Sequence, residues 1–281
     1  MSDDKNPFPG ENNTGHIWDE NIRELDNPPP RWWMIAFYLS LAWVFGYIFL
    51  YPSLPIGHES TKGYWGWTQI QELKEAEAEV LKIRQPYEDK IAKLTAKEIL
   101  ADESLTAYVE ASVKVLFGDN CAACHGNGGQ GNPNFPVLVD DDWLYGGTIE
   151  KIEETIAGGR KGNMPAHATI LNTSEVNSLA ESIVAGKVLE NPLYASKSCI
   201  GCHTATATGM QLLGSANLVD KIYRFKANDQ LASVKYTILH GINQPNDKES
   251  REAIMPTFKD RLTTDQIKKL AVYVHRLGGG Q

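Results

Sequence analysis

Two short segments hold all four cysteines of the chain, and both follow the same pattern of two cysteines and a histidine. Residues 121–125 read Cys-Ala-Ala-Cys-His, and residues 199–203 read Cys-Ile-Gly-Cys-His. C-x-x-C-H is the attachment pattern of c-type haem, in which two thiols form thioethers with the porphyrin and the histidine binds the iron. Two intervening residues put both sulfurs on one turn of backbone. The predicted covalent haem c attachment points are Cys121, Cys124, Cys199 and Cys202, and the predicted axial iron ligands include His125 and His203.

Three other chemistries use cysteine pairs, and each fits this spacing less well. A zinc site takes two such pairs, but here each histidine directly follows a second cysteine, and the motifs lie 78 positions apart (199 − 121). A thioredoxin-like redox pair needs a βαβ context, which the sequence does not show. Two disulfides would leave the position of the histidines unexplained. Attachment of two haem c groups accounts for both cysteines and the histidine of each motif.

A methionine followed by proline comes after each motif and is the predicted second axial ligand of each iron. Met164 lies 39 positions after His125 (164 − 125). Met255 lies 52 positions after His203 (255 − 203). Thioether sulfur is neutral and soft, so it favours ferrous iron and raises the potential relative to two histidines. We predict that Met164 pairs with His125, and that Met255 pairs with His203. The alternative, that each methionine only fills apolar space, does not explain why both copies place it alike.

Two further histidines remain alternative ligands. His167 lies three residues beyond Met164, and His240 lies in the second copy where the first has Gly158. An iron with two protein ligands has no open position for a substrate, so the chain is expected to carry electrons. The sequence shows no nucleophile–base pairing, P-loop or nucleotide-binding glycine motif, and we predict no catalytic residue. Candidate partners of the haem carboxylates are Trp143, Arg160 and Lys161.

The elements around the two motifs repeat: a helix, the motif, a short helix, a Met-Pro loop and a last helix. The offset between matching positions grows from 78 at the motifs to 82 at the middle helices and 91 at the methionines, so the second copy contains insertions. We predict an all-α fold with two tandem cytochrome c domains. Apolar residues at helical spacing predict a helix that starts after Asp102 and ends at Gly118. The other predicted helix caps are Thr148, Asn172, Asn228 and Thr263.

One stretch near the N-terminus is apolar enough to cross a membrane. Residues 32–51 carry no charge and have aromatic residues at both ends. A helix of this length, rising about 1.5 Å per residue, spans a bilayer core of about 30 Å. The haem motifs fit an oxidising compartment, and the positive charges before the span favour a cytoplasmic N-terminus. The formal net charge of −8 over 281 residues argues against nucleic acid as a partner.

These features divide the chain into five predicted segments. Pro86 is expected to interrupt a charged helix in the third of them. The segments are a cytoplasmic tail (1–31), a transmembrane helix (32–51), a partly helical stalk (52–100), a first cytochrome c domain (101–188) and a second cytochrome c domain (189–281).

The tail carries a more specific resemblance. Residues 18–20 read Trp-Asp-Glu, and residues 24–33 read Glu-Leu-Asp-Asn-Pro-Pro-Pro-Arg-Trp-Trp. Followed by one span and two C-x-x-C-H units with Met-Pro loops, this arrangement resembles CcoP (FixP), the dihaem subunit of cbb3-type cytochrome c oxidases. The resemblance covers essentially the whole chain.

The resemblance implies a dihaem cytochrome in the bacterial inner membrane with periplasmic haem domains. It implies that electrons come from a soluble c-type cytochrome and pass, through a monohaem partner subunit, toward an integral membrane catalytic subunit. That subunit reduces dioxygen and pumps protons, so no dioxygen-reducing site is expected in this chain. It also implies the two histidine–methionine pairs given above. The alternatives are a dihaem subunit of a dehydrogenase or nitrogen-oxide reductase, and a haem-based sensor with a labile sixth ligand.

Overall fold

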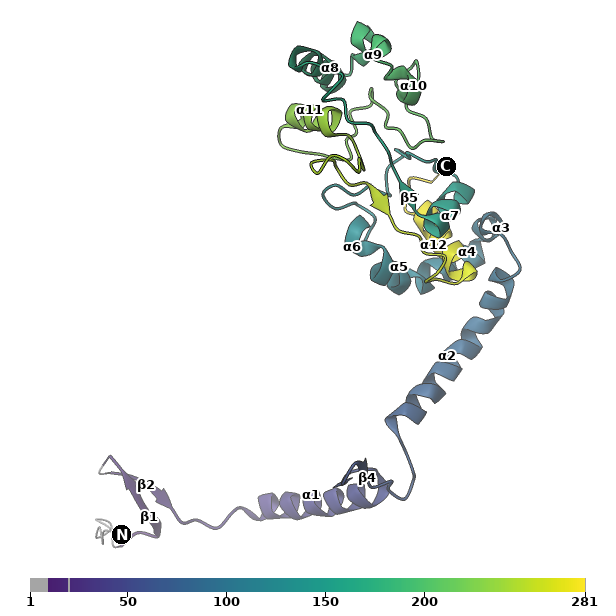
Figure 1. The fold of residues 1–281 in the computed structure, drawn as a ribbon. Helices are drawn as coiled ribbons and strands as arrows, with labels where there is room; N and C mark the ends of the chain where they lie inside the picture. Colours follow the sequence, from purple (N-terminus) through teal and green to yellow (C-terminus); the bar gives the residue numbers. More distant parts are fainter. Residues whose placement is uncertain (1–9, 20, 281) are drawn as a thin grey trace. The chain divides into compact units, whose positions relative to one another are not determined.

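The computed structural model describes residues 10–19 and 21–280, so part of the predicted tail (1–9 and 20) lies outside the described residues. The chain divides into two compact units, Met1–Ile83 and Arg84–Gln281. Figure 1 shows that helices dominate, and the longest described strand has six residues. The predicted helical class with an N-terminal apolar helix is confirmed.

The first unit contains the predicted span. An antiparallel hairpin of β1 (Asn13–Trp18) and β2 (Ile22–Leu25) precedes α1 (Arg31–Leu50). By length and composition α1 is able to cross a membrane, and none of its residues is buried in protein. Its bounds agree with the predicted span within one residue at each end. A second small hairpin follows, formed by β3 (Pro55–Ile56) and β4 (Glu59–Ser60).

Helix α2 (Gln69–Ile91) corrects the expectation that Pro86 interrupts the stalk helix. The helix passes through Pro86 and continues to Ile91. An interior proline removes one backbone hydrogen bond and costs about 3 kcal/mol, but tertiary contacts hold the segment beyond it. Ile91 is fully buried, and the Tyr87 ring stacks on Tyr108 with centroids 4.6 Å apart. Packing of this last turn therefore outweighs the local cost of proline.

The helix expected from Asp102 to Gly118 is two helices in the structure. Asp102 caps the first as predicted, because its carboxylate accepts a hydrogen bond from the Leu105 amide at 3.1 Å. The chain bends at the buried Val113 and then passes through Gly118, so the predicted end was wrong. The burial of Phe117 keeps the helix intact there. The elements up to the first motif are α3 (Ala96–Ala101), α4 (Glu103–Ser112), α5 (Lys114–Asn120) and α6 (Ala122–His125).

Three of the four other predicted caps are confirmed. Thr148 caps α7, and capping boxes at Asn172 and Thr263 begin α8 and α12. Asn228 was wrong: α11 begins one residue later, and the cap is Asp229, which accepts from the Ala232 amide at 2.9 Å. The remaining elements are α7 (Ile149–Gly158), β5 (Arg160–Lys161), α8 (Thr173–Ala185), η1 (Val188–Glu190), α9 (Pro192–Ser196), α10 (Ile200–His203), α11 (Gln230–His240), β6 (Ile254–Met255) and α12 (Thr264–Arg276).

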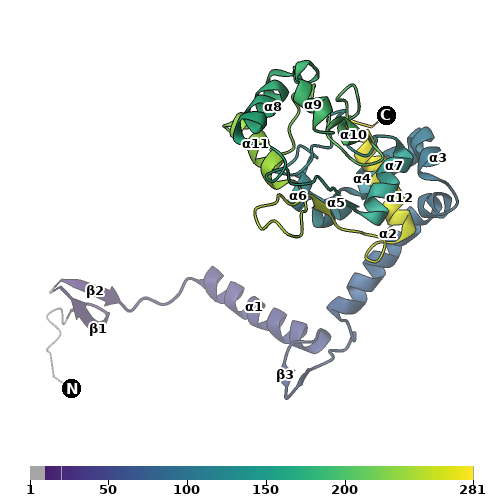
Figure 2. The ribbon, with the colours of Figure 1, turned by 45° about the horizontal axis from the view of Figure 1, so that its top comes forward.

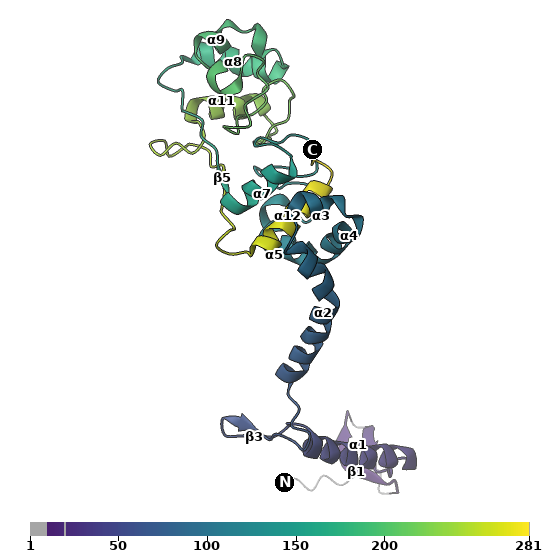
Figure 3. The same cartoon turned by 90° about the vertical axis from the view of Figure 1, so that its right-hand side faces the viewer.

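The last helices of the two repeats are exchanged. Helix α8, from the first repeat, packs on α11 of the second, as Figures 1 and 3 show. Helix α12, from the second repeat, packs on α7, α3 and α4 of the first (Figure 2). The buried core accordingly forms two clusters, one from residues 91–156 with 258–274 and one from residues 171–238. The predicted boundary at residue 188 separates the two sequence repeats. It does not separate the two buried clusters, because α8 lies before it and packs with the second cluster.

Candidate haem sites

Each C-x-x-C-H motif forms one helical turn. The His125 amide donates to the Cys121 carbonyl at 2.9 Å, and the His203 amide donates to the Cys199 carbonyl at 3.0 Å. None of the four cysteines forms a disulfide, which removes that alternative. Burial raises the pKa of the Cys121 thiol to about 11 and also raises that of Cys199. The two thiols are therefore neutral at pH 7 and lie in apolar surroundings.

The two motif histidines are held in the same way. The Nδ1 of His125 lies 2.9 Å from the Pro136 carbonyl oxygen, and the Nδ1 of His203 lies 2.8 Å from that of Ala216. A carbonyl accepts only from a protonated nitrogen, so this contact leaves Nε2 with its lone pair available for a metal. Burial lowers the pKa of both rings, against the opposing effect of the carbonyl hydrogen bonds. Both imidazoles are thus oriented and neutral, as iron ligands require.

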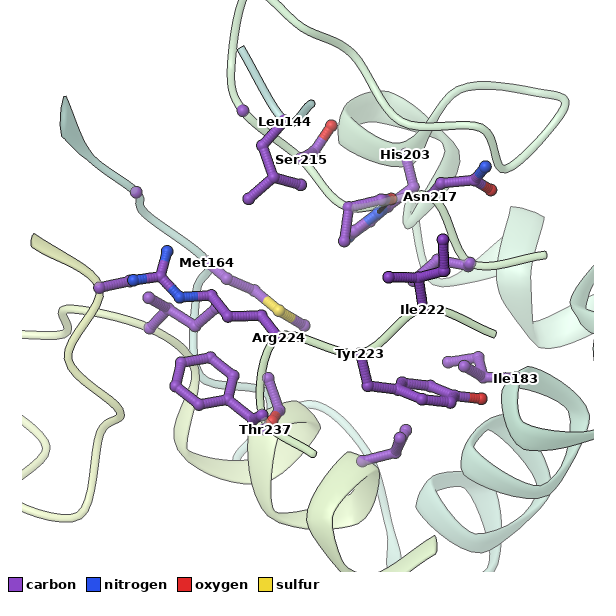
Figure 4. Close-up of a pocket in the computed structure, with 18 of the residues that line it drawn as sticks. Leu144, Met164, Ile183, His203, Ser215, Asn217, Ile222, Tyr223, Arg224 and Thr237 are labelled. Atoms are coloured by element: carbon purple, nitrogen blue, oxygen red, sulfur yellow. Dashed lines mark hydrogen bonds between the residues drawn. The ribbon is translucent and has the colours of Figure 1, made fainter. Parts of the chain in front are cut away.

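One apolar cavity brings together a complete set of haem c donors. It is lined by His203, by the thiol residues Cys199 and Cys202, and by Met164. Figure 4 shows the Met164 side chain and the His203 ring bordering the same space. The donor types and the apolar walls fit a haem c group. Other apolar lining residues are Leu171, Leu179, Ile183, Tyr194, Leu218 and Ile238.

Met164 therefore lies with the second motif, which corrects the pairing expected from sequence order. Met255 lies with the first motif: it packs against the buried cluster of residues 91–156 and 258–274, which Cys121 and Trp143 also contact. The pairs that the structure brings together are Met164 with the second motif and Met255 with the first. The exchange of α8 and α12 explains these pairs. Each methionine lies in the loop before an exchanged helix, so it lies beside the repeat on which that helix packs.

Two glycines at matching helix ends permit the crossing. Gly159 follows α7 with φ +68°, and Gly241 follows α11 with φ +65°. A Cβ at Gly159 would collide with the Met255 carbonyl, and a Cβ at Gly241 would collide with the Met164 carbonyl. Each glycine therefore admits the methionine loop of the other repeat, at a φ that side chains rarely adopt.

The rival histidines differ in their surroundings. His167 lines the cavity of the second motif, and its buried Nδ1 has no hydrogen-bond partner among the described residues. The His240 ring is occupied: Nδ1 lies 2.9 Å from an Asp247 carboxylate oxygen, and Nε2 lies 3.4 Å from one of Glu249. His167 is thus free to meet a polar group in the cavity, whereas His240 is held outside it.

Arg224 is a charged residue of the cavity that the sequence patterns did not indicate. Its guanidinium is partly buried, donates from Nε to the Asn134 carbonyl at 3.3 Å, and has no carboxylate partner among the residues that the structure describes. Burial lowers the pKa of Arg224, and its charge contributes to the lowered pKa of His125. A buried cation without an anion fits a ligand that supplies carboxylates. Comparison of the two repeats offers a signal for Arg224, because the first repeat has the apolar Leu144 at the matching position, 80 residues earlier (224 − 144).

Two of the predicted carboxylate partners are already engaged. The Trp143 indole donates to the Gly279 carbonyl, and Arg160 bonds Glu154 at 3.0 Å. Lys161 is exposed in β5. None of these three residues lines the cavity of the second motif, whereas Arg224 and His167 do, together with other polar residues such as Asp142 and Lys221.

The fold and the paired motifs define a class: a chain with one N-terminal apolar helix and two tandem cytochrome c domains. Family models match three successive parts of it. They are the N-terminal domain of cytochrome oxidase-cbb3, FixP (residues 10–58), cytochrome c oxidase, cbb3-type, subunit III (110–181), and cytochrome c (191–278).

Curated relatives extend the match to nearly the full length. The chain is 37% identical to a cbb3-type cytochrome c oxidase subunit FixP of Azorhizobium caulinodans, covering 97% of this chain and 94% of the relative. It is 35% identical to a subunit CcoP of Azospirillum brasilense, covering 99% of each. The chain belongs to the FixP/CcoP family of cbb3-type cytochrome c oxidase subunits. It is thus a subunit of an oxidoreductase complex, and its cytochrome c domains imply haem c binding.

Proposed function

We propose that this chain is the membrane-anchored electron carrier of its oxidase. It accepts electrons from a soluble c-type cytochrome and passes them toward the integral membrane subunit that reduces dioxygen. Family membership and two cytochrome c domains support this role. The observation that carries the proposal is the single apolar cavity lined by Met164, by His203 and by both thiols of the second motif, which is a full set of haem c ligands.

Residues of both repeats hold each haem in this proposal. Cys199 and Cys202 attach the second haem, and His203 with Met164 binds its iron. The same arrangement at the first site uses two thiols, one histidine of the first motif and the methionine of the second repeat. The first-site residues are Cys121, Cys124, His125 and Met255.

Haem c supplies reversible one-electron chemistry when bound. The protein side chains decide what that chemistry is used for. The carbonyl contacts of His125 and His203 fix the ring orientations, and the thioether ligands favour the reduced state. Histidine and methionine together leave no coordination position for dioxygen, so reduction of dioxygen and proton pumping belong to partner subunits.

The proposed location is the bacterial inner membrane, with α1 as a single span. The N-terminus lies in the cytoplasm and both cytochrome c domains lie in the periplasm. An oxidising compartment suits four cysteines destined for thioether bonds, and apolar residues over the whole surface of α1 suit lipid. The proposed partners are the catalytic subunit, a monohaem cytochrome c subunit and a soluble c-type cytochrome.

The test is purification of the complex from membranes through an affinity tag on this chain. We expect two covalent haems in this chain by haem stain and pyridine haemochrome spectrum, and oxygen consumption with reduced cytochrome c as donor. A matched preparation that carries Cys199→Ala and Cys202→Ala should assemble but consume oxygen slowly. Copurification of a dehydrogenase or nitrogen-oxide reductase, without oxygen consumption, would contradict the proposal.

A further inference from the structure

The two methionine loops meet at one hydrogen-bonded junction, which we define as residues 160–164, 241–244 and 251–255. Strands β5 and β6 pair antiparallel within it, with Arg160 opposite Met255. Met164 pairs in turn with Ile242: the amide of each donates to the carbonyl of the other, at 3.2 and 2.9 Å. Both methionines therefore belong to one backbone network rather than to two independent loops.

The side chain of Asn243 connects the two loops. Its Nδ2 donates to the Gly162 carbonyl at 2.6 Å and to the Ala253 carbonyl at 3.1 Å, and its Oδ1 accepts from the Ala253 amide at 3.0 Å. Gly162 precedes Met164 by two residues, and Ala253 precedes Met255 by two. One amide group thus contacts both loops at the same distance along the chain from their methionines.

Asn243 has the backbone that this role needs. Its φ is +53°, in the left-handed region that asparagine tolerates better than most residues. Its own amide donates to the Arg251 carbonyl at 2.8 Å. Gln244 next to it touches only one side, because its Nε2 donates to the Asn163 side chain at 2.6 Å and to the Ile242 carbonyl at 3.1 Å. The Asn243 side chain therefore contacts both methionine loops, whereas the Gln244 side chain contacts only the Met164 loop.

The insertion that carries Asn243 is anchored to α11 at its outer end. The His240 ring lies between the carboxylates of Asp247 and Glu249, 2.9 and 3.4 Å from its two nitrogens. The Tyr236 hydroxyl donates to the Glu249 carbonyl at 2.7 Å, and Arg251 donates to the Ser233 hydroxyl at 2.9 Å. These contacts fix the insertion, so its inner end presents a rigid amide to the two loops.

We propose that Asn243 is a positioning residue shared by both haem sites. By holding the Met164 and Met255 loops together, it keeps both thioethers at their irons and makes the two reduction potentials depend on one side chain. The proposal rests on the proposed ligation by these methionines. The insertion in the second repeat thereby acquires a role, since it lets one residue reach both loops.

The experiment uses the full chain in detergent and reads each haem separately. Asn243→Gly keeps the positive φ and removes all three side-chain hydrogen bonds. We expect it to lower both midpoint potentials, to weaken the thioether-to-iron charge-transfer band, and to broaden or lose both upfield methionine methyl signals in proton NMR of the reduced protein. Gln244→Ala, the matched control, should alter only the signal and potential of the Met164 site.

Reference variants separate this idea from the ligand assignment. Met164→His and Met255→His should each remove one of the two methyl signals; if neither does, the proposed ligation itself fails. If both do, but Asn243→Gly alters one haem or neither, the shared role of Asn243 is overturned. Should Asn243→Gly mature poorly, Asn243→Asp still accepts from the Ala253 amide but loses the donor to both the Gly162 and the Ala253 carbonyls. One of the two side-chain contacts with the Met255 loop then remains, and none with the Met164 loop. The variant should therefore perturb the Met164 signal more than the Met255 signal, and the opposite pattern would also overturn the proposal.

Discussion

Met164 lies in the same cavity as His203, although it stands 39 positions from His125 and 39 positions from His203 (164 − 125 and 203 − 164). Sequence distance alone therefore cannot assign its partner. The structure places it with His203 because helix α8, which follows Met164, packs on α11.

Replacement of Met164 tests this pairing directly. In a Cys121→Ala/Cys124→Ala background, only the second attachment site remains. Met164→His should then lower the potential of the remaining haem by on the order of 0.2 V and keep it low-spin, because axial ligands tune haem potentials over about 0.8 V. Redox titration measures this shift. Met210→Leu, outside the cavity lining, is the control and should leave the potential unchanged. An unaltered titration of the Met164 variant would remove this residue from the second site.

A substitution in an exchanged helix should destabilise the repeat on which that helix packs. Leu270 of α12 is fully buried in the first cluster, and Leu179 of α8 is almost fully buried in the second. Leu270→Ala and Leu179→Ala should each cost about 2–5 kcal/mol. Limited proteolysis with mass spectrometry should find the first cleavages of Leu270→Ala within residues 91–156, and those of Leu179→Ala within residues 171–238. The reverse pattern would show that each repeat packs with its own last helix.

Arg224 should raise the potential of the first haem, because its charge acts on His125, and that of the second haem, whose cavity it lines. A positive charge near the iron disfavours the ferric state, so Arg224→Gln should lower both potentials by on the order of 40 mV, which corresponds to about 1 kcal/mol for one electron. Lys226→Gln removes an exposed charge two residues away and serves as the control. Redox titrations of the two variants compare them. Equal shifts would mean that net charge, rather than the buried position of Arg224, sets the effect.

Asp142 should make stability depend on pH. Burial raises its pKa to about 6, and the charges of Asp220, Asp140 and Asp141 add to the shift. An unfolded aspartate titrates at about 4, so between these values the folded protein binds more protons than the unfolded chain. Stability therefore falls as pH rises through this window. Asp142→Asn should be about 1 kcal/mol more stable at pH 7, with partial solvent screening taken into account. Its advantage should vanish below about pH 4 in thermal melts.

Each cysteine should be needed for covalent attachment at its own site. Cys121→Ala should impair covalent haem retention at the first site, and Cys202→Ala should impair it at the second. Each variant loses one of the two thioether bonds at its site. Haem stain after denaturing electrophoresis, combined with mass spectrometry of haem-bearing peptides, reports which site is affected. Full incorporation in both variants would contradict the thioether assignment.

Local signals in the sequence predicted most individual elements. The caps at Asp102, Thr148, Asn172 and Thr263 depend on side chains that accept from amides three residues away, so neighbouring residues suffice to identify them. Local signals failed where distant contacts decide. Helix α2 survives Pro86 because Tyr87 and Ile91 pack against residues from elsewhere in the second unit.

The sequence by itself determined the residues available for chemistry: two C-x-x-C-H motifs, two methionines in Met-Pro loops and one apolar span. Residue types and short spacings can be recognised without knowledge of the fold. The tertiary structure alone decided which methionine meets which histidine. That choice depends on where α8 and α12 pack, and both helices have similar apolar faces. It is settled by close approaches such as Gly159 to Met255 and Gly241 to Met164, which join residues about 80 to 100 positions apart.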